Sequence, residues 1–222
     1  MTQATTGPDV NVLERDVFEV IGTQRAMRRL KPDAVPEELI KKLIWAATRA
    51  PSGGNTQPWR FLVVTDAEKR KQIAELYLEG WNRYVKAGYT DRAPAVSPEA
   101  QAAAERTLRS AQYLADHLHE VPVHIIPCTW KLEVNTGIAS GSSIYPAIQN
   151  LMLAARALGL GTALTTIHRW NEDKVREVLG IPESAETAAL IPVGWPKGKF
   201  GAGPRLPVEA VTYWDSWGAK RQ

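Results

Sequence analysis

The sequence lacks long apolar runs and has little cysteine. No stretch approaches the roughly 18 apolar residues that a membrane-spanning helix needs, and the N-terminus shows neither the basic nor the apolar region of a signal peptide. Cys128 is the single cysteine, which excludes an internal disulfide and fits a reducing compartment. We therefore predict a cytoplasmic protein that does not bind membranes.

The chain also lacks a strong excess of one charge. Its 27 basic and 24 acidic residues give a formal net charge of +3. The cations are scattered, apart from a short cluster of Arg25, Arg28, Arg29 and Lys31. This cluster is too small to indicate nucleic-acid binding, but it is sufficient to hold one anionic ligand.

Several catalytic motifs are missing. There is no GxGxxG, GxxxxGK[ST], GxSxG or CxxC, so the usual patterns of Rossmann sites, P-loops, α/β-hydrolases and thioredoxin-like proteins are absent. His117 and His119 lie two residues apart on a predicted helix and face different directions, so we predict no metal site. Cys128 lies near the end of a predicted strand, where a buried inert thiol is expected rather than a nucleophile.

The residues that are present predict a mixture of helices and strands. The 222 residues suffice for one domain with a sizeable core, and we predict a single domain over 1–222 with a loose tail over 1–12. Apolar spacing and end signals predict helices over 14–28, 36–50, 66–85, 98–119, 142–159 and 171–180, and strands over 60–66, 121–130, 162–167 and 187–195. This order indicates an α+β or α/β sheet covered by helices.

One turn between a helix and a strand is unusually rich in glycine and amides. The segment RAPSGGNTQPWRFLVV, residues 49–64, stops the helix and begins the strand, for which one glycine is enough. The second glycine would let the backbone approach a ligand closely. Asn55, Gln57 and Trp59 add amides and an aromatic ring, which suit the edge of a flat heterocycle such as flavin.

Two basic segments are candidate anion contacts. Arg25 and Arg28 either complement the end of the first predicted helix or clamp a phosphate or carboxylate, whose geometry the guanidinium fork matches. Lys199 and Arg205 lie in a glycine-rich loop, where bare backbone beside cations also suits an anion. Neither segment alone distinguishes a ligand contact from a solvated surface.

A pair of threonines is the last candidate. Thr165 and Thr166 lie in the segment LTTIHRW, which is predicted to be a strand. Threonines pack well in strands, so a purely structural role is one explanation. The other is that a hydroxyl hydrogen-bonds a ring nitrogen of a ligand.

Three segments together resemble a known family. RAMRRLKPDAVPEELIKKLIWAATRAPSGGNTQPWRFLVV is similar to the N-terminal signature of the nitroreductase family of FMN-dependent oxidoreductases. SGSSIYPAIQNLMLAARALGLGTALTT resembles the central dimer helix of that family and the strand after it, and VGWPKGKFGAGPRLPVEAVTYWD resembles its C-terminal phosphate-binding segment. The three matches occur in the order of the family and span about 20 to 217.

The resemblance implies a fold, a cofactor and an assembly. It implies an α+β fold with a central mixed or antiparallel sheet flanked by helices, and an intertwined homodimer with two FMN sites at its interface. The residues that map onto FMN contacts are Arg25, Ala26, Arg28, Pro51, Ser52, Gly53, Asn55, Gln57, Ser142, Thr165, Thr166, Lys199 and Arg205. Gln24 and Ala26 depart from the arginine and serine common in the family, which gives Arg205 more weight as a phosphate contact.

The resemblance also implies the reaction. A hydride from NAD(P)H reaches flavin N5 and passes to a small-molecule acceptor such as a nitroaromatic or quinone in ping-pong order, with Thr165 and Thr166 near N5 and no assigned general acid. Trp81, Tyr84 and Tyr89 are candidate substrate walls, although core packing is an equal explanation for Trp81. Reductive dehalogenation, activated-alkene reduction, and flavin binding without turnover stay open as alternatives.

Overall fold

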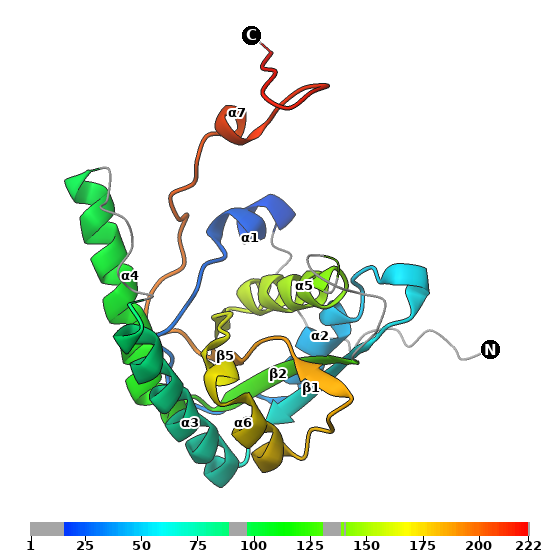
Figure 1. Cartoon of the computed structure of the whole chain (residues 1–222), viewed down its shortest axis with the longest axis vertical. Helices are drawn as coiled ribbons and strands as arrows, with labels where there is room; N and C mark the ends of the chain where they lie inside the picture. The colour runs from blue at the N-terminus through cyan, green and yellow to red at the C-terminus, as the bar shows by residue number, and fades with distance from the viewer. Residues whose placement is uncertain (1–15, 89–96, 131–138, 140, 222) are drawn as a thin grey trace.

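A five-stranded antiparallel sheet forms the centre of the molecule (Figure 1). This computed structural model describes residues 16–88, 97–130, 139 and 141–221. The strands are β1 (Trp59–Val64), β2 (Val123–Trp130), β3 (Gly161–Thr162), β4 (Ala185–Thr187) and β5 (Ile191–Gly194). Their order is β1-β2-β5-β3, and β4 also pairs with β2. The predicted α+β class with an antiparallel sheet is confirmed.

Helices cover both faces of the sheet. They are α1 (Val17–Thr23), α2 (Glu37–Ala47), α3 (Ala67–Lys86), α4 (Pro98–His117), α5 (Ile144–Ala157), α6 (Glu172–Leu179) and α7 (Val208–Val211), with short 3₁₀ turns η1 (Gly53–Asn55), η2 (Leu118–Glu120) and η4 (Ile167–Asn171). Figure 1 shows α2 and α5 on one side of the sheet and α3 and α6 on the other. Among the described residues, no helix is long and apolar enough to cross a membrane.

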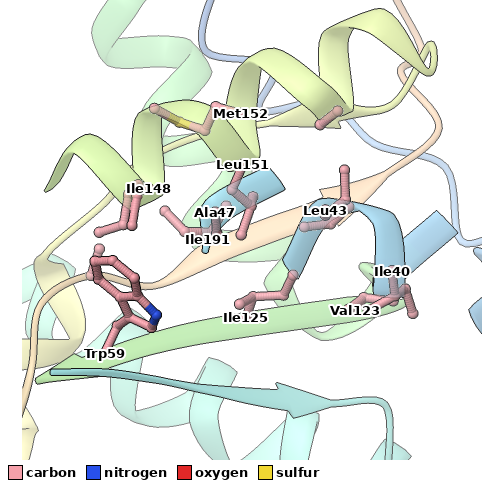
Figure 2. Packing of buried hydrophobic residues seen from close by; sticks show 14 of the residues in the cluster. Ile40, Leu43, Ala47, Trp59, Val123, Ile125, Ile148, Leu151, Met152 and Ile191 are labelled. Atoms are coloured by element: carbon pink, nitrogen blue, oxygen red, sulfur yellow. The ribbon is translucent and has the colours of Figure 1, made fainter. Parts of the chain in front are cut away.

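The core consists of two apolar layers because successive strand residues face opposite sides of the sheet. Ile125 of β2 packs into the layer under α2 and α5, whereas Ile126 packs into the layer over α3. Figure 2 shows the first layer, in which Trp59 at the start of β1 lies beside Ile148 of α5. The sheet is therefore buried on both faces. This packing fixes the positions of the strand ends, beside which the candidate site residues lie.

Two predicted elements are shorter than expected. The first helix ends at Thr23 rather than at 28, because the following backbone is extended and pairs elsewhere: Met27 N–H donates to the Thr162 carbonyl (2.8 Å). The strand predicted over 162–167 ends at Thr162, and Thr165 forms only an isolated bridge with Leu190 before η4 begins. Arg25 and Arg28 thus lie on an extended segment, and their predicted position at a helix end is wrong.

The last predicted strand is broken in two. β4 and β5 both pair with β2, but Pro127 of β2 has no N–H to donate and interrupts the ladder between them. Ala188 N–H still donates to the Pro127 carbonyl (2.8 Å). The break lets Leu190 bridge to Thr165, which places this threonine beside the centre of the sheet.

An arm extends away from the body after Phe200. Figure 1 shows residues 201–221, with α7, leading from the sheet past α1 toward the C-terminus. Its apolar side chains are exposed in the single chain, as in Leu206 (71%), Val208 (69%) and Trp217 (93%). Phe18 on α1 is similarly exposed (78%).

Candidate functional site

The basic segment after α1 is fixed against two distant parts of the chain. Residues 27–31 run alongside β3 and the end of β5: Met27 bonds Thr162, Lys31 N–H donates to the Trp195 carbonyl (2.7 Å), and Leu30 bridges Pro196. Lys197 N–H in turn donates to the Arg29 carbonyl (2.9 Å). The N-terminal and C-terminal basic segments of the sequence are therefore neighbours in the fold.

Gly161 makes this close approach possible. A Cβ atom at this position would lie 2.7 Å from Leu30 Cδ2 and 2.8 Å from Met27 Cβ. Both distances are far below ordinary van der Waals contact. The sequence alone did not reveal this role of Gly161. It lies two residues after Gly159, which ends helix α5 in a left-handed conformation (φ 78°).

Arg28 is the most buried cation of the cluster. It is half-buried, and burial lowers the pKa of its guanidinium from the ordinary value; the Tyr77 hydroxyl opposes this shift, and the charge of Arg25 adds to it. No carboxylate among the described residues counters this lowering of the Arg28 pKa. A half-buried cation beside a second cation favours an anionic ligand, because the ligand restores the lost charge balance.

A buried tyrosine connects Arg28 with the threonine pair. The Tyr77 hydroxyl lies 2.8 Å from Thr165 Oγ1, and Tyr77 itself is 3% exposed. Thr166 is exposed and caps η4, where its carbonyl accepts from Arg169 N–H (3.0 Å). Arg25, Arg28, Tyr77 and Thr165 therefore form one cluster on the side of the sheet where β3 ends. Sequence reasoning missed Tyr77 because a tyrosine on the inner face of a helix is typical of a core.

The glycine-rich turn lies at the other end of the sheet. Trp59, which follows the turn, pairs with Thr129 near the end of β2, whereas the basic segment lies beside the β5 residues that pair with Val123 at its start. Figure 1 shows the turn (cyan) and the basic segment (blue) on opposite sides of the molecule. Within one chain, the predicted site residues therefore form two separate groups, one around the glycine-rich turn and one around the basic segment.

The conformation of the turn is unusual. Gly54, Asn55 and Gln57 have positive φ (57°, 54° and 48°), which is uncommon for the two non-glycine residues. Ser52 stabilises it: its hydroxyl accepts from Gln57 N–H (3.1 Å) and its carbonyl from Asn55 N–H (2.9 Å). Gly53 has no positive φ and no atom within 4 Å of a built Cβ. Neither its backbone conformation nor its packing against the described residues requires a glycine at 53.

The remaining predicted contacts divide between the two groups. Pro51 is exposed beside the turn, and exposed Ser142 precedes α5, whose first turns pack in the same core layer as Trp59. Exposed Ala26 lies on the basic segment, and Lys199 is exposed on the loop that packs near it. Arg205 is exposed on the arm, where its Nη1 donates to the Pro204 carbonyl (2.9 Å).

The aromatic substrate candidates are placed differently from one another. Trp81 is 4% exposed, its Nε1 donates to Gln112 Oε1 (2.7 Å), and its ring stacks on Tyr84. These contacts favour the packing explanation for Trp81. Tyr84 is half-buried and contacts Trp170 edge-on (6.2 Å between centroids). Tyr89 lies outside the described residues.

Cys128, His124 and His168 are buried and uncharged near pH 7. Burial raises the pKa of the Cys128 thiol to about 11, which keeps it protonated. Burial lowers the pKa of His124 and of His168 to about 4, so both are neutral near pH 7. Among the described residues, no group of histidine, cysteine and carboxylate side chains could hold a metal ion. The feature that points to a ligand is therefore the half-buried Arg28 beside Arg25, which favours an anion.

Comparison with known proteins identifies relatives over most of the chain. The model of the nitroreductase family matches residues 21–195. A putative NADH dehydrogenase/NAD(P)H nitroreductase of Methanothermobacter thermautotrophicus is 31% identical over 198 residues, covering 87% of this chain and 84% of its own. Mouse iodotyrosine deiodinase 1 is 28% identical over 202 residues, covering 85% of this chain and 65% of its own. A crystal structure of oxidized iodotyrosine deiodinase bound to FMN and 3-iodo-L-tyrosine has the same fold (TM-score 0.67, 23% identity, 87% and 96% of the two chains covered).

Proposed function

The chain belongs to the nitroreductase family, and we propose that it is an FMN-dependent oxidoreductase that uses NAD(P)H to reduce nitroaromatic, quinone or similar electron-poor acceptors. The observation that carries this proposal is the cluster of Arg25, Arg28, Tyr77 and Thr165. It combines the charge that a phosphate and a reduced flavin require with a hydroxyl suited to a ring nitrogen.

The residues of both groups fit FMN. Arg25, with Lys199 and Arg205, would hold the phosphate, because guanidinium and ammonium groups form strong charge-assisted hydrogen bonds to it. Gly53 and Asn55 would let the backbone approach the isoalloxazine ring, since no described residue fills the space at position 53. The positive φ of Asn55 and Gln57 supports a ligand-binding role, because strained backbone often occurs at such sites.

A homodimer would bring the two groups together. In one chain, the glycine-rich turn and the basic segment lie at opposite ends of the sheet. A second copy would supply the missing turn and the start of α5 at Ser142. The exposed apolar side chains of α1 and the arm support this assembly, because large contiguous apolar surface usually marks an interface. We propose that each FMN site is built from both protomers.

The roles of the chain's residues follow from this placement. Bound FMN would supply the chemistry of hydride transfer from NAD(P)H to the acceptor, in the proposed ping-pong order. Arg28 would stabilise the negative charge that develops near N1 of the ring, and its low-dielectric surroundings strengthen that effect. Thr165 would hydrogen-bond the N5 region. No side chain has to act as a nucleophile.

The test is spectroscopic and uses the purified protein. We expect a yellow protein that NADPH or NADH bleaches without oxygen and that a nitroaromatic or quinone restores to yellow. A protein that stays yellow with both donors would instead be a flavin-binding protein without turnover. A colourless protein that takes up no FMN would refute the proposal.

The phosphate assignment has its own test. Arg205→Ala should weaken FMN binding about 30-fold, or ~2 kcal/mol, because one charge-assisted contact is lost. Arg109→Ala on α4 is the matched control, since Arg109 is also exposed and its ion pair among the described residues is with Glu105, one helical turn away (3.7 Å). Wild-type FMN affinity in Arg205→Ala would exclude this residue as a phosphate contact.

Reductive dehalogenation is the second candidate, and the deiodinase relative supports it. In that reaction, two electrons from reduced flavin and a proton replace a carbon–iodine bond by carbon–hydrogen and release iodide. Adding 3-iodo-L-tyrosine to the anaerobically reduced protein and measuring iodide distinguishes the two functions. Iodide formed in amounts equal to the oxidised flavin would favour dehalogenation, and none would favour the first proposal.

A further inference from the structure

Tyr77 is a buried side chain whose hydroxyl is aimed at a ligand-contacting residue. Its ring lies in the apolar layer between the sheet and α3, yet its hydroxyl reaches Thr165 Oγ1 at 2.8 Å. A phenylalanine would fill the same space without the cost of burying a polar group. The hydroxyl is therefore not explained by packing, and its hydrogen bond to Thr165, the one found for it among the described residues, indicates a role that acts through this threonine.

The frame around this contact is rigid. Gly80, one turn after Tyr77, lets α3 approach η4 closely: a built Cβ would lie 2.9 Å from the Ile167 carbonyl oxygen and 3.0 Å from Trp170 Cβ. Asn171 fastens η4 to α3, because its Nδ2 donates to the Leu76 carbonyl (2.8 Å). Arg83 Nη2 donates to the Trp170 carbonyl (2.8 Å). These contacts between α3 and η4 thus fix the distance between the Tyr77 and Thr165 hydroxyls.

The 2.8 Å contact allows either hydroxyl to donate, and the surroundings favour Tyr77 as the donor. Thr165 Oγ1 already faces the Ile167 N–H (3.4 Å), and the Thr165 backbone pairs fully with Leu190 (3.1 and 2.8 Å). The charge of Arg28 acts on Tyr77 and favours the arrangement in which the phenolic oxygen faces the cation and the proton points away from it. Tyr77 then donates to Thr165. The one hydroxyl proton of Thr165 is left to donate to a ligand.

We propose that Tyr77 is a positioning residue that holds Thr165 as a hydrogen-bond donor toward the flavin ring, and so favours oxidised over reduced FMN. This inference rests on the proposed function. N5 of the oxidised ring accepts a hydrogen bond, whereas N5 of the reduced ring carries a proton and donates one. A threonine fixed as a donor therefore binds the oxidised ring better.

The experiment measures the dissociation constants of oxidised and reduced FMN, titrated into the apo-protein without oxygen. In Tyr77→Phe, we expect the affinity ratio of oxidised to reduced FMN to fall about tenfold, equivalent to ~30 mV for a two-electron couple. Thr165→Val should lower the ratio similarly, and adding Tyr77→Phe to it should cause no further change. Tyr113→Phe is the control, since the Tyr113 hydroxyl bonds Lys197 (3.0 Å) and not Thr165.

The outcomes separate this inference from the function on which it rests. If wild type binds FMN and Tyr77→Phe changes both dissociation constants equally or not at all, Tyr77 is only structural and the inference is overturned. An additive double variant would overturn it too, because the two residues would then act independently. If wild type binds no FMN, the proposed function itself fails.

Discussion

Gly161→Ala should displace the segment that carries Arg25 and Arg28. The new Cβ would lie 2.7 Å from Leu30 Cδ2 and 2.8 Å from Met27 Cβ. Gly161 pairs with Gly194 in the buried sheet, so the strand cannot move away and the segment must shift. Overpacking of this kind costs about 1–3 kcal/mol. For a chain of this size, ~2 kcal/mol lowers the melting temperature by about 4–8 °C.

The same substitution should weaken FMN binding. Arg28 follows directly after Met27, whose N–H bond to Thr162 fixes the register of the segment. A shift that lengthens one charge-assisted contact to FMN should cost at least ~1.4 kcal/mol, or about tenfold in the dissociation constant. Thermal unfolding followed by circular dichroism gives the first quantity, and fluorescence titration of the apo-protein with FMN gives the second.

Gly198→Ala is the matched control. Its Cβ would lie 3.9 Å from Cε of the same Met27, which is an ordinary van der Waals contact. We expect a melting temperature within about 2 °C of wild type, because surface substitutions usually change stability by less than ~0.5 kcal/mol. Gly161→Ala with both wild-type stability and wild-type FMN affinity would refute the reasoning that this glycine positions the basic segment.

Three further predictions follow from which side chains are buried and which are exposed. His124 and His168 are neutral in the folded protein, since burial lowers the pKa of each from 6.5 to about 4, whereas in the unfolded chain both bind protons below pH 6.5. The free energy of unfolding should therefore be highest above pH 6.5 and should fall by up to ~2 kcal/mol per histidine by about pH 5. Equal urea midpoints at pH 7 and about pH 5 would contradict this. Cys128, with a thiol pKa of about 11, should react with a disulfide reagent at pH 8 only after urea is added, and prompt labelling of the native protein would disprove its burial. Phe18→Asp should convert the proposed dimer to a monomer while Leu108→Asp on α4 stays dimeric, as measured by light scattering, because both side chains are exposed in one chain (78% and 40%) but Phe18 lies on the proposed interface. A Phe18→Asp variant that stays dimeric would contradict this placement.

The sequence by itself determined the class of the fold and most of its elements. The apolar runs of β1 and β2 and the helical spacing of α2 and α5 are local patterns, which a single sequence displays directly. Gly159 and Gly180 end their helices with positive φ because only local backbone geometry is involved. The family was also readable, since the matching segments keep their order along the chain, and the flavin contacts that the resemblance implies stay a prediction.

Only the tertiary structure decided which of these residues meet. The helix predicted through Arg28 gave way to an extended segment, because its backbone bonds to Thr162 and Trp195, more than 130 residues away, are stronger constraints than local helix propensity. The fold placed Tyr77 beside Thr165, although nothing in a helix pattern separates a core tyrosine from one that directs a hydroxyl. It also placed the glycine-rich turn at the far end of the sheet from Arg28. Such contacts depend on which distant segments pair in the sheet, and the local spacing of residues in the sequence does not determine this pairing.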